Sequence, residues 1–331
     1  MKKITLLLLI INLYTTAFNQ VIRGTVYDKR TKNAICFATV YFNGTFMGTT
    51  ADQDGLFMLN VAKNKSTPIT ISAVGYYSVT LADYSKSEPL VIYLEPKTYE
   101  IEEVVVSSRS LERKRRRYLA LFRDEFIGTT DNAQNCKILN EGDITFNYYS
   151  DNDTIKAYAL KPILIENKSL GYKVTYYLDK FEFYKKRGIT FFCGNIIFNE
   201  DLAEGNANKE DYVRARKLAY LGSRMHFFRE LWSGSLESTG FTVMNLETRH
   251  LLISEFVTTD ENNNKYLKYP LNLYIDYYVK FVNHKSIIKL LEDNVYFDES
   301  GFFNPSGITW DGDMAKLRIA DWLPYEYSFE L

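Results

Sequence analysis

His226 and Glu230 are the two side chains whose spacing is typical of acid–base chemistry. They stand four residues apart in a segment of helical period, so both fall on one face of a helix, near Ser223 and Arg224. An imidazole oriented by a carboxylate can act as a general base. His226 also borders the apolar stripe of this helix, so the pair could equally bond only to each other. His226 and Glu230 are therefore the weak candidates for catalytic residues. We expect that they have a structural role and that neither acts in catalysis.

Motifs of other catalytic classes are missing from the sequence. The chain has no G-x-S-x-G elbow, no phosphate-binding P-loop and no G-x-G-x-x-G dinucleotide motif. No glutamate follows His226, His250 or His284 by three residues, and H-E-x-x-H does not occur, so we predict no metal and no cofactor. Asp311 and Asp313 could form a glycosidase-like carboxylate pair, but spacing along the chain does not give their separation in space.

Asp52, Asp54 and Gly55 stand in an order that calcium-binding loops also use. With Gly55 at the sixth position of an EF-hand loop, Thr50 comes first and Val61 comes twelfth, where the loop needs a bidentate glutamate. Because that ligand is missing, a tight hairpin with an Asx-type turn accounts better for these residues.

The composition is that of a globular protein rich in β-structure. The 331 residues include 40 Lys and Arg against 41 Asp and Glu, and a net charge of −1 gives no overall attraction to nucleic acid or to anionic membranes. The 26 Tyr, 22 Phe and 3 Trp make up 15% of the chain, and aromatic side chains favour strands. At roughly 150 residues per domain, a chain of this length suggests about two domains.

Residues 1–20 have the pattern of a secretory signal peptide. A lysine pair precedes an apolar run at residues 4–11, and small and polar residues follow. The run is shorter than the ~20 apolar residues that a membrane-spanning helix needs. We expect cleavage between Ala17 and Gln20, and export to the periplasm, the outer membrane or the cell surface without a helical anchor.

Residues 21–107 are predicted to form a Greek-key β-sandwich. Apolar residues alternate with polar ones in short runs, so that every second side chain can enter a core. The turns contain Asn43-Gly44, Asp54-Gly55 and Gly75, whose glycines can adopt the positive φ that tight reversals require. The alternating runs begin at Ile22, Ala38, Phe57, Ile69 and Leu90.

Several motifs in this module stand in a fixed order. They are Gly24-x-Val26-x-Asp28, Ala38-Thr39-Val40, Asn43-Gly44-Thr45, Gly48-Thr49-Thr50, Asp52-x-Asp54-Gly55-x-Phe57 and Val74-Gly75-Tyr76. Together they resemble the carboxypeptidase-regulatory-like domain, a transthyretin-like β-sandwich. The following Glu103-Val104-Val105-Val106 resembles the segment that ends this domain in TonB-dependent receptors of Gram-negative bacteria.

The resemblance implies an accessory domain and no catalytic activity. In metallocarboxypeptidases this sandwich accompanies a separate zinc-binding catalytic domain, whose H-x-x-E ligand pair is absent from this sequence. We therefore expect the chain not to be an enzyme.

Residues 108–128 are predicted as a basic linker with a short helix. The run at residues 109–117 carries six Arg and Lys side chains against Glu112. Such a run can bind phosphate groups. In an exported protein we expect a solvated linker, with anionic lipid or lipopolysaccharide phosphate as the alternative partner.

Residues 129–331 are predicted as a second, β-rich α+β domain, which makes the whole chain mainly β. Alternation over residues 271–281 indicates one long strand, and the polar turn at residues 260–264 would join it to residues 251–257. One long amphipathic helix is expected within residues 208–232, ended by Gly234. Its apolar face would be Leu218, Leu221, Met225, Phe228 and Trp232.

The three cysteines are too few for a disulfide framework in a chain of this length. A bridge between Cys136 and Cys193 is possible after export, because the compartment would be oxidising. We favour buried, unpaired thiols for these residues and for Cys36.

Three classes of function remain open on the sequence. The first is a non-enzymatic envelope protein that binds another protein or a glycan through the carboxypeptidase-regulatory-like domain, and it follows from the signal peptide and the lack of catalytic motifs. The second is a secreted hydrolase that uses carboxylates or His226. The third is a small outer-membrane β-barrel or receptor-associated protein, suggested by the alternation of Tyr325, Tyr327, Phe329 and Leu331. We favour the first and expect no nucleic-acid partner.

Export gives the first testable prediction. Edman sequencing of the protein recovered from an envelope fraction should start between Phe18 and Val21, because signal peptidase removes the apolar run. Recovery of intact Met1 in the cytoplasm would contradict it.

Overall fold

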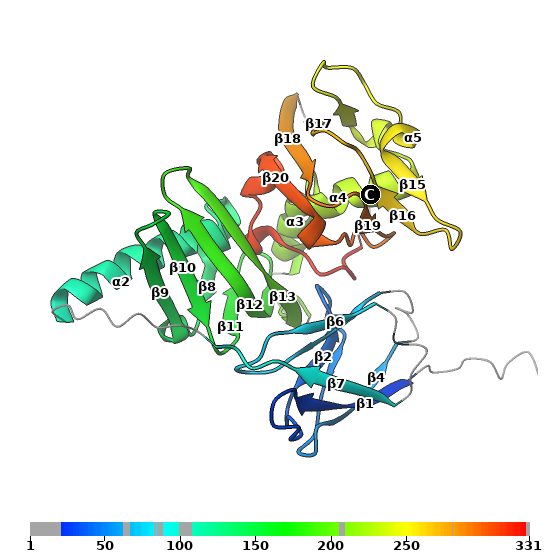
Figure 1. Ribbon diagram of the computed structural model, residues 1–331. Helices are drawn as coiled ribbons and strands as arrows, with labels where there is room; N and C mark the ends of the chain where they lie inside the picture. The colour runs from blue at the N-terminus through cyan, green and yellow to red at the C-terminus, as the bar shows by residue number, and fades with distance from the viewer. Residues whose placement is uncertain are drawn as a thin grey trace, which may run out of the picture. The chain divides into compact units, whose positions relative to one another are not determined.

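The computed structural model describes residues 21–61, 67–82, 84, 89–98, 108–204, 209–279 and 281–328 (Figure 1). The predicted signal peptide and the Glu103–Val106 motif lie outside these residues. The chain divides into two compact units, residues 1–43 with 47–98 and residues 44–46 with 99–331. Both units are built mainly from strands, so the mainly β fold class is confirmed.

The first unit is a sandwich of two small sheets. One sheet has the strand order β4-β1-β7 and the other the order β3-β2-β5-β6. Central strand β1 runs antiparallel to β4 and parallel to β7. Their bounds are β1 (Val21–Asp28), β2 (Thr39–Phe42), β3 (Gly48–Thr50), β4 (Leu56–Asn60), β5 (Ile69–Ser72), β6 (Val79–Leu81) and β7 (Leu90–Leu94).

The core of the sandwich follows from the alternation in its strands. Val26, Phe57 and Ile92 come from the three strands of one sheet, are almost fully buried and belong to one cluster. The predicted positive φ is confirmed at Gly44, Gly55 and Gly75, where φ is 78°, 74° and 84°. At Gly55 a side chain would also collide with the Val26 carbonyl, since an added Cβ would lie 2.8 Å from that oxygen.

The second unit begins with a helix that contains the basic run. Helix α2 spans Ser108–Phe122 and continues into a π-helical turn, η1 (Arg123–Ile127). The prediction of a solvated linker over residues 109–117 was therefore wrong: the run is helical. Its C-terminal end carries Phe122, Phe126 and Ile127 into a core, and that burial holds the helix in place.

A six-stranded antiparallel sheet follows α2. The strand order is β8-β11-β12-β10-β9, and β13 pairs with β12 in a long hairpin. Their bounds are β8 (Cys136–Ile138), β9 (Ile144–Tyr149), β10 (Thr154–Ala159), β11 (Ile163–Asn167), β12 (Tyr172–Tyr184) and β13 (Ile189–Asp201).

Two helices replace the single long amphipathic helix that the sequence predicts. They are α3 (Lys209–Tyr220) and α4 (Arg224–Ser233), and the break lies at Gly222, where φ is +77°. Gly234 ends α4 in a left-handed conformation, as predicted. Leu218 does not share the apolar face, because it is 62% exposed.

Two further sheets complete the second unit. One has the order β14-β17-β18-β20 and the other the order β15-β16-β19. Strands β14 (Phe241–Met244), β17 (Leu273–Val279), β18 (Val282–Leu290) and β20 (Ile308–Gly312) form the first, and β15 (Val257–Thr259), β16 (Lys265–Leu267) and β19 (Val295–Phe297) form the second. Two short helices lie between their strands, α5 (Ile253–Phe256) and η5 (Pro305–Gly307), whereas η4 (Glu237–Thr239) precedes β14 and α6 (Asp313–Lys316) follows β20. Three more lie elsewhere in the unit: η2 (Asp131–Asn135), η3 (Glu141–Asp143) and η6 (Ile319–Asp321).

The long strand predicted over residues 271–281 is shorter and has different partners. Leu271 and Phe281 lie outside β17 and are 60% and 92% exposed. The turn at residues 260–264 joins β15 to β16, whereas β17 pairs with β14 and β18. The alternation in the sequence correctly predicts a strand here, but the alternation extends beyond both ends of the strand that forms, Leu273–Val279.

Helix α4 contributes to two hydrophobic clusters of the second unit. Met225 belongs to the cluster around the six-stranded sheet, together with Ile319 and Leu323. Phe227 and Phe228 belong to the cluster around the β14-β17-β18-β20 sheet. Residues next to each other on α4 thus link the two halves of this unit.

None of the three cysteines forms a disulfide, and Cys36 is exposed rather than buried. The possible Cys136–Cys193 bridge is not formed. Burial raises the pKa of the Cys136 thiol to about 12. The alternating C-terminal residues Tyr325 to Ser328 are not in a strand, and residues 329–331 lie outside the described part. Within the described residues, no helix is long and apolar enough to cross a membrane.

The sandwich should fold as an isolated fragment of residues 21–107, because its core cluster uses only side chains from this segment. We expect one cooperative thermal transition by circular dichroism. Ile71→Ala removes a fully buried side chain and should cost about 2–5 kcal/mol, whereas Val91→Ala, at a 58% exposed position, should change little. A fragment without a cooperative transition would contradict the prediction.

Candidate functional site

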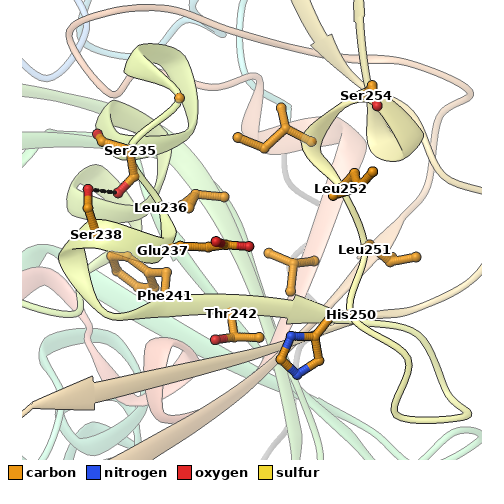
Figure 2. A pocket seen from close by; sticks show the side chains of 13 residues that line it. Ser235, Leu236, Glu237, Ser238, Phe241, Thr242, His250, Leu251, Leu252 and Ser254 are labelled. Atoms are coloured by element: carbon orange, nitrogen blue, oxygen red, sulfur yellow. Dashed lines mark hydrogen bonds between the residues drawn. The ribbon is translucent and has the colours of Figure 1, made fainter.

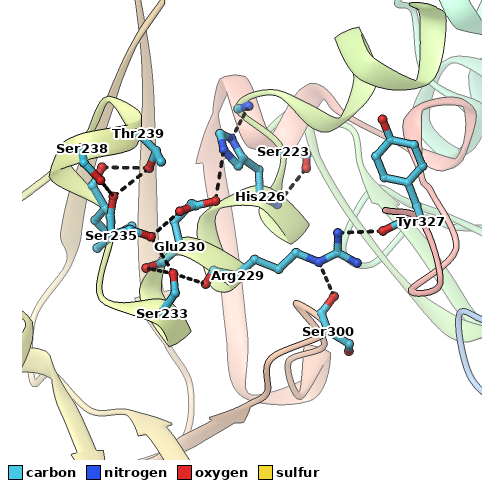
Figure 3. Close-up of polar contacts among 12 residues, drawn as sticks. Ser223, His226, Arg229, Glu230, Ser233, Ser235, Ser238, Thr239, Ser300 and Tyr327 are labelled. Atoms are coloured by element: carbon cyan, nitrogen blue, oxygen red, sulfur yellow. Dashed lines mark hydrogen bonds and ion pairs between the residues drawn. The ribbon is translucent and has the colours of Figure 1, made fainter. Parts of the chain in front are cut away.

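Ser223 and Gly222 fix the position of His226 at the start of α4. Ser223 is the N-cap residue, and its hydroxyl oxygen accepts the backbone N–H of His226 at 3.1 Å (Figure 3). The backbone N–H of Gly222 donates to Nδ1 of the imidazole, also at 3.1 Å. The left-handed conformation of Gly222 allows this return of the chain. The Nδ1 lone pair is therefore already occupied.

The other ring nitrogen faces Glu230, as the spacing in the sequence predicts. His226 Nε2 lies 3.7 Å from Glu230 Oε1. Because Nδ1 accepts a hydrogen bond, the proton of the neutral ring is on Nε2 and points toward this carboxylate. The other oxygen of Glu230 accepts the hydroxyl of Ser235, which also bonds to the hydroxyl of Ser233 at 2.6 Å (Figure 3). The structure thus brings the two candidates together, and each of them contacts other groups of the protein: His226 contacts Gly222 and Glu230, and Glu230 contacts Ser235.

Aromatic rings surround His226 and keep it uncharged. The side chain is 5% exposed, and its ring centroid lies 4.7 Å from that of Tyr220, 4.9 Å from that of Phe241 and 5.5 Å from that of Tyr277. This burial, and secondly the positive charge of Arg229, lower the pKa of His226 to about 4. A neutral imidazole without a free lone pair cannot take a proton from a substrate.

Arg229 is a structural residue of this region that the sequence analysis missed. Its guanidinium donates to the backbone carbonyls of Ser300 and Tyr327, both at 2.8 Å (Figure 3). It also donates to a third carbonyl, that of Tyr325, at 3.1 Å. It thereby ties α4 to two segments far along the chain. No sequence motif predicts this role of Arg229, because the acceptors of its hydrogen bonds are main-chain atoms.

The remaining carboxylate candidates have structural partners. Asp313 forms an ion pair with Lys316 at 2.7 Å, and the hydrogen bond from Lys316 is the main cause of its lowered pKa. His284 Nδ1 lies 3.4 Å from the other oxygen of Asp313. Asp311 accepts the N–H of Gly312. Asp52 accepts the N–H groups of Asp54 and Leu56 at 2.9 Å, which is the predicted Asx-type turn. In the described part of the chain, no three His, Cys, Asp or Glu side chains are grouped so that they could hold a metal ion.

An open groove of about 640 Å³ is the second feature of this region (Figure 2). One side comes from η4 and β14, and the other from the segment that leads into α5. Leu236, Phe241, Val243 and Leu251 give it buried apolar walls, whereas Leu252 is 67% exposed. The polar residues that line it are Ser235, Glu237, Ser238, Thr242, His250 and Ser254.

Strand β14 lies at the edge of its sheet and borders the groove. Its backbone bonds on the outer side are the Phe241 N–H to the Leu236 carbonyl and the Leu251 N–H to the Val243 carbonyl, both at 2.9 Å. Both N–H and C=O of a strand residue point to the same side, so the Phe241 carbonyl and the Val243 N–H face this outer edge as well. Phe241 is 0% and Val243 4% exposed, so a partner reaches these two groups only when the segments that cover them move apart. Glu237 lies beside them, and among the described residues its carboxylate has no ion pair or hydrogen bond.

Comparison with known families concerns the first unit. Residues 22–106 match the model of the CarboxypepD_reg-like domain family. The first unit is therefore a carboxypeptidase-regulatory-like domain. A search among curated proteins finds none that matches the chain.

This match confirms the predicted resemblance of the first unit to the carboxypeptidase-regulatory-like domain. The family is regulatory in type, not catalytic, which is compatible with a protein that is not an enzyme. Neither the His226 network nor the groove beside β14 belongs to this domain. Both lie in the second unit, outside the matched residues 22–106.

A structural His226 predicts a specific dependence of stability on pH. The unfolded imidazole takes up a proton near its ordinary pKa of 6.5, whereas the folded one does so only near 4. As the pH falls from 6.5 to 4, the unfolded state therefore gains a proton that the folded state does not bind. The wild type should lose up to about 3 kcal/mol of stability relative to His226→Gln over this range.

Urea unfolding of both proteins between pH 7.5 and 4 measures this difference. At pH 7.5 the variant should be less stable by about 1 kcal/mol, since it loses the hydrogen bond between the Gly222 N–H and the imidazole Nδ1. Carboxylates that titrate in the same pH range are present in both proteins, so their contribution to the free energy of unfolding cancels in the difference between the two. Parallel stability curves for the two proteins would contradict the buried, uncharged imidazole.

Proposed function

We propose that the chain is an exported, non-enzymatic envelope protein whose second unit binds an extended segment of another protein. The observation that carries this proposal is the edge of β14 beside the groove, where a partner strand can bond the Phe241 carbonyl and the Val243 N–H once the segment that leads into α5 moves aside. The lysine pair and apolar run at the N-terminus support the compartment. The closed network around His226 supports a role in binding rather than in catalysis.

Strand addition accounts for the features of the groove. An extended peptide antiparallel to β14 would donate one N–H to the Phe241 carbonyl and accept the Val243 N–H through one of its own carbonyls. Beyond this pair, the bond between Leu251 and Val243 closes the edge, so the site is short. Side chains on one face of the peptide would contact the apolar walls at Leu236 and Leu252.

Glu237 gives the groove a preference for charge. Its exposed carboxylate stands at the rim without a partner among the described residues. A basic side chain of the bound segment can form an ion pair there. The preferred occupant is therefore an extended segment with alternating apolar residues and one arginine or lysine.

Synthetic peptides test this function directly. Peptides of alternating valine and threonine with one arginine should bind the full-length protein in fluorescence polarisation. Glu237→Lys should weaken binding about tenfold, because an attraction becomes a repulsion. Glu261→Lys, the same change in the exposed turn after β15, should not. N-methylation of the central amides should abolish binding, since strand addition needs those donors.

Three outcomes would contradict the proposal. They are failure of every such peptide to bind, equal binding by the N-methylated peptide, and binding of a glycan that Glu237→Lys impairs. Turnover of a peptide, ester or glycoside substrate that His226→Gln abolishes without unfolding the protein would establish the hydrolase alternative instead.

A further inference from the structure

The basic run of α2 is held against the six-stranded sheet by one of its own arginines. Arg115 donates to the backbone carbonyls of Ile144 at 2.6 Å and of Glu141 at 2.8 Å. The centre of the Tyr118 ring lies 6.2 Å from that of Phe146, edge to face. Helix α2 therefore lies beside β9, and the basic run has a fixed place on the second unit (Figure 1).

A second basic segment, far along the chain, approaches the same helix. Residues 185–187, Lys-Lys-Arg, belong to the turn between β12 and β13 and are all exposed. Lys114 Nζ lies 5.8 Å from the centre of the Tyr148 ring, and Lys185 Nζ lies 5.1 Å from the same centre. Burial raises the pKa of the Tyr118 phenol, and the positive charge of Lys185 is the main opposing effect. The helix and the turn thus place their cations around the same two tyrosines.

We call the solvent-facing cations of these two segments the basic surface. Arg116 is not counted, because it pairs with Glu112 at 3.6 Å. The neighbouring turn between β9 and β10 adds two carboxylates, Asp151 and Asp153, which leaves an excess of four positive charges among the described residues. The whole chain has a net charge of −1, so this excess is local. The basic surface consists of Arg113, Lys114, Arg117, Lys185, Lys186 and Arg187.

The cations of α2 repel one another. Arg113 and Arg117 stand four residues apart and are neighbours on one face of the helix, where like charges destabilise it. Lys114 lies three residues before Arg117 on the same face. In the part of the chain that the structure describes, none of these three forms an ion pair with a carboxylate. A negatively charged partner would remove the repulsion.

The arrangement of the basic surface suits a plane of many phosphates better than a single small anion. A small anion needs donors that converge on one point, whereas these cations are spread over a helix and a turn. Each lysine or arginine near an anionic bilayer adds to the attraction, and tyrosine rings favour the level of the lipid head groups. Leu111 and Ile189, which are 40% and 53% exposed, flank the two basic segments and can contact lipid.

We propose that the basic surface binds the anionic face of a lipid bilayer through the phosphate groups of its lipids. The guanidinium groups of Arg113 and Arg117 would donate to phosphate oxygens, and Lys186 and Arg187 in the turn would bind further phosphates beside them. The sequence names anionic lipid only as an alternative partner of residues 109–117, and the fold adds the second segment. None of these residues lines the groove beside β14, so the proposal does not depend on the peptide site.

Flotation of the full-length protein with lipid vesicles tests this surface. In about 0.1 M NaCl, the protein should float with phosphatidylcholine vesicles that contain about 30% phosphatidylglycerol, and not with pure phosphatidylcholine. In about 0.5 M NaCl, binding should weaken about tenfold or more, because salt screens exposed charges.

Matched variants locate the binding on the two segments. Arg117→Gln and Lys186→Gln should each weaken binding about fivefold, and both together about 25-fold, because each cation near the bilayer contributes separately. Both residues are exposed, so these variants should fold, which circular dichroism checks. Lys137→Gln with Lys289→Gln is the control: it removes two exposed charges elsewhere in the second unit and should change binding by less than about twofold.

The proposal is overturned if the wild type floats equally with both kinds of vesicle or with neither. It is also overturned if Arg117→Gln or Lys186→Gln binds like the wild type, or if the control pair weakens binding as much as they do together. Polyglutamate, added at the same concentration of negative charge as the lipid, is the probe for an acidic protein partner. Release of the protein from the vesicles by polyglutamate would overturn the assignment to lipid, and retention on the vesicles supports it.

Discussion

The left-handed conformation of Gly222 is the constraint on which the second unit depends. It interrupts the helical path between α3 and α4, and an added side chain would lie 2.8 Å from the ring of Tyr277. The break places Ser223 as the cap of a new helix and directs the Gly222 N–H to His226. From this start, α4 sends Met225 into one core and Phe227 and Phe228 into another. One backbone angle therefore sets both the closed histidine network and the packing of two sheets.

The sandwich could be predicted from sequence because its signals are local. Strands β1, β4 and β7 alternate with period two, and Gly44, Gly55 and Gly75 mark turns by a conformation that other residues rarely adopt. The second unit was harder because its apolar periodicity does not stop where its elements stop. The helical pattern runs across Gly222, and the alternation around β17 continues to Leu271 and Phe281. The pairing of β17 with β14 and β18 is long-range, and local pattern carries no information about it.

The candidate site was predictable in part. A spacing of four residues on a helix brings His226 near Glu230, and the structure has them 3.7 Å apart. The backbone N–H of Gly222 occupies the Nδ1 lone pair of His226, so it decides whether this imidazole can act as a base. A bond from a main-chain group cannot be predicted from residue types, because every residue has the same main chain. For the same reason, the sequence does not predict the three carbonyls that Arg229 binds. The groove beside β14 combines a strand edge with a segment several residues later, so it exists only once the chain has folded.

The position of β1 in its sheet has a consequence for how the first unit forms. β1 is the first strand of the sandwich and pairs with the last, β7, through the parallel register of Gly24 with Leu90. Nearly the whole module must be available before this central strand gains both neighbours. Contacts so distant in sequence are associated with folding in milliseconds to seconds rather than microseconds. During synthesis, the opening strand therefore waits with one edge unpaired, and the sandwich closes only when its final segment arrives.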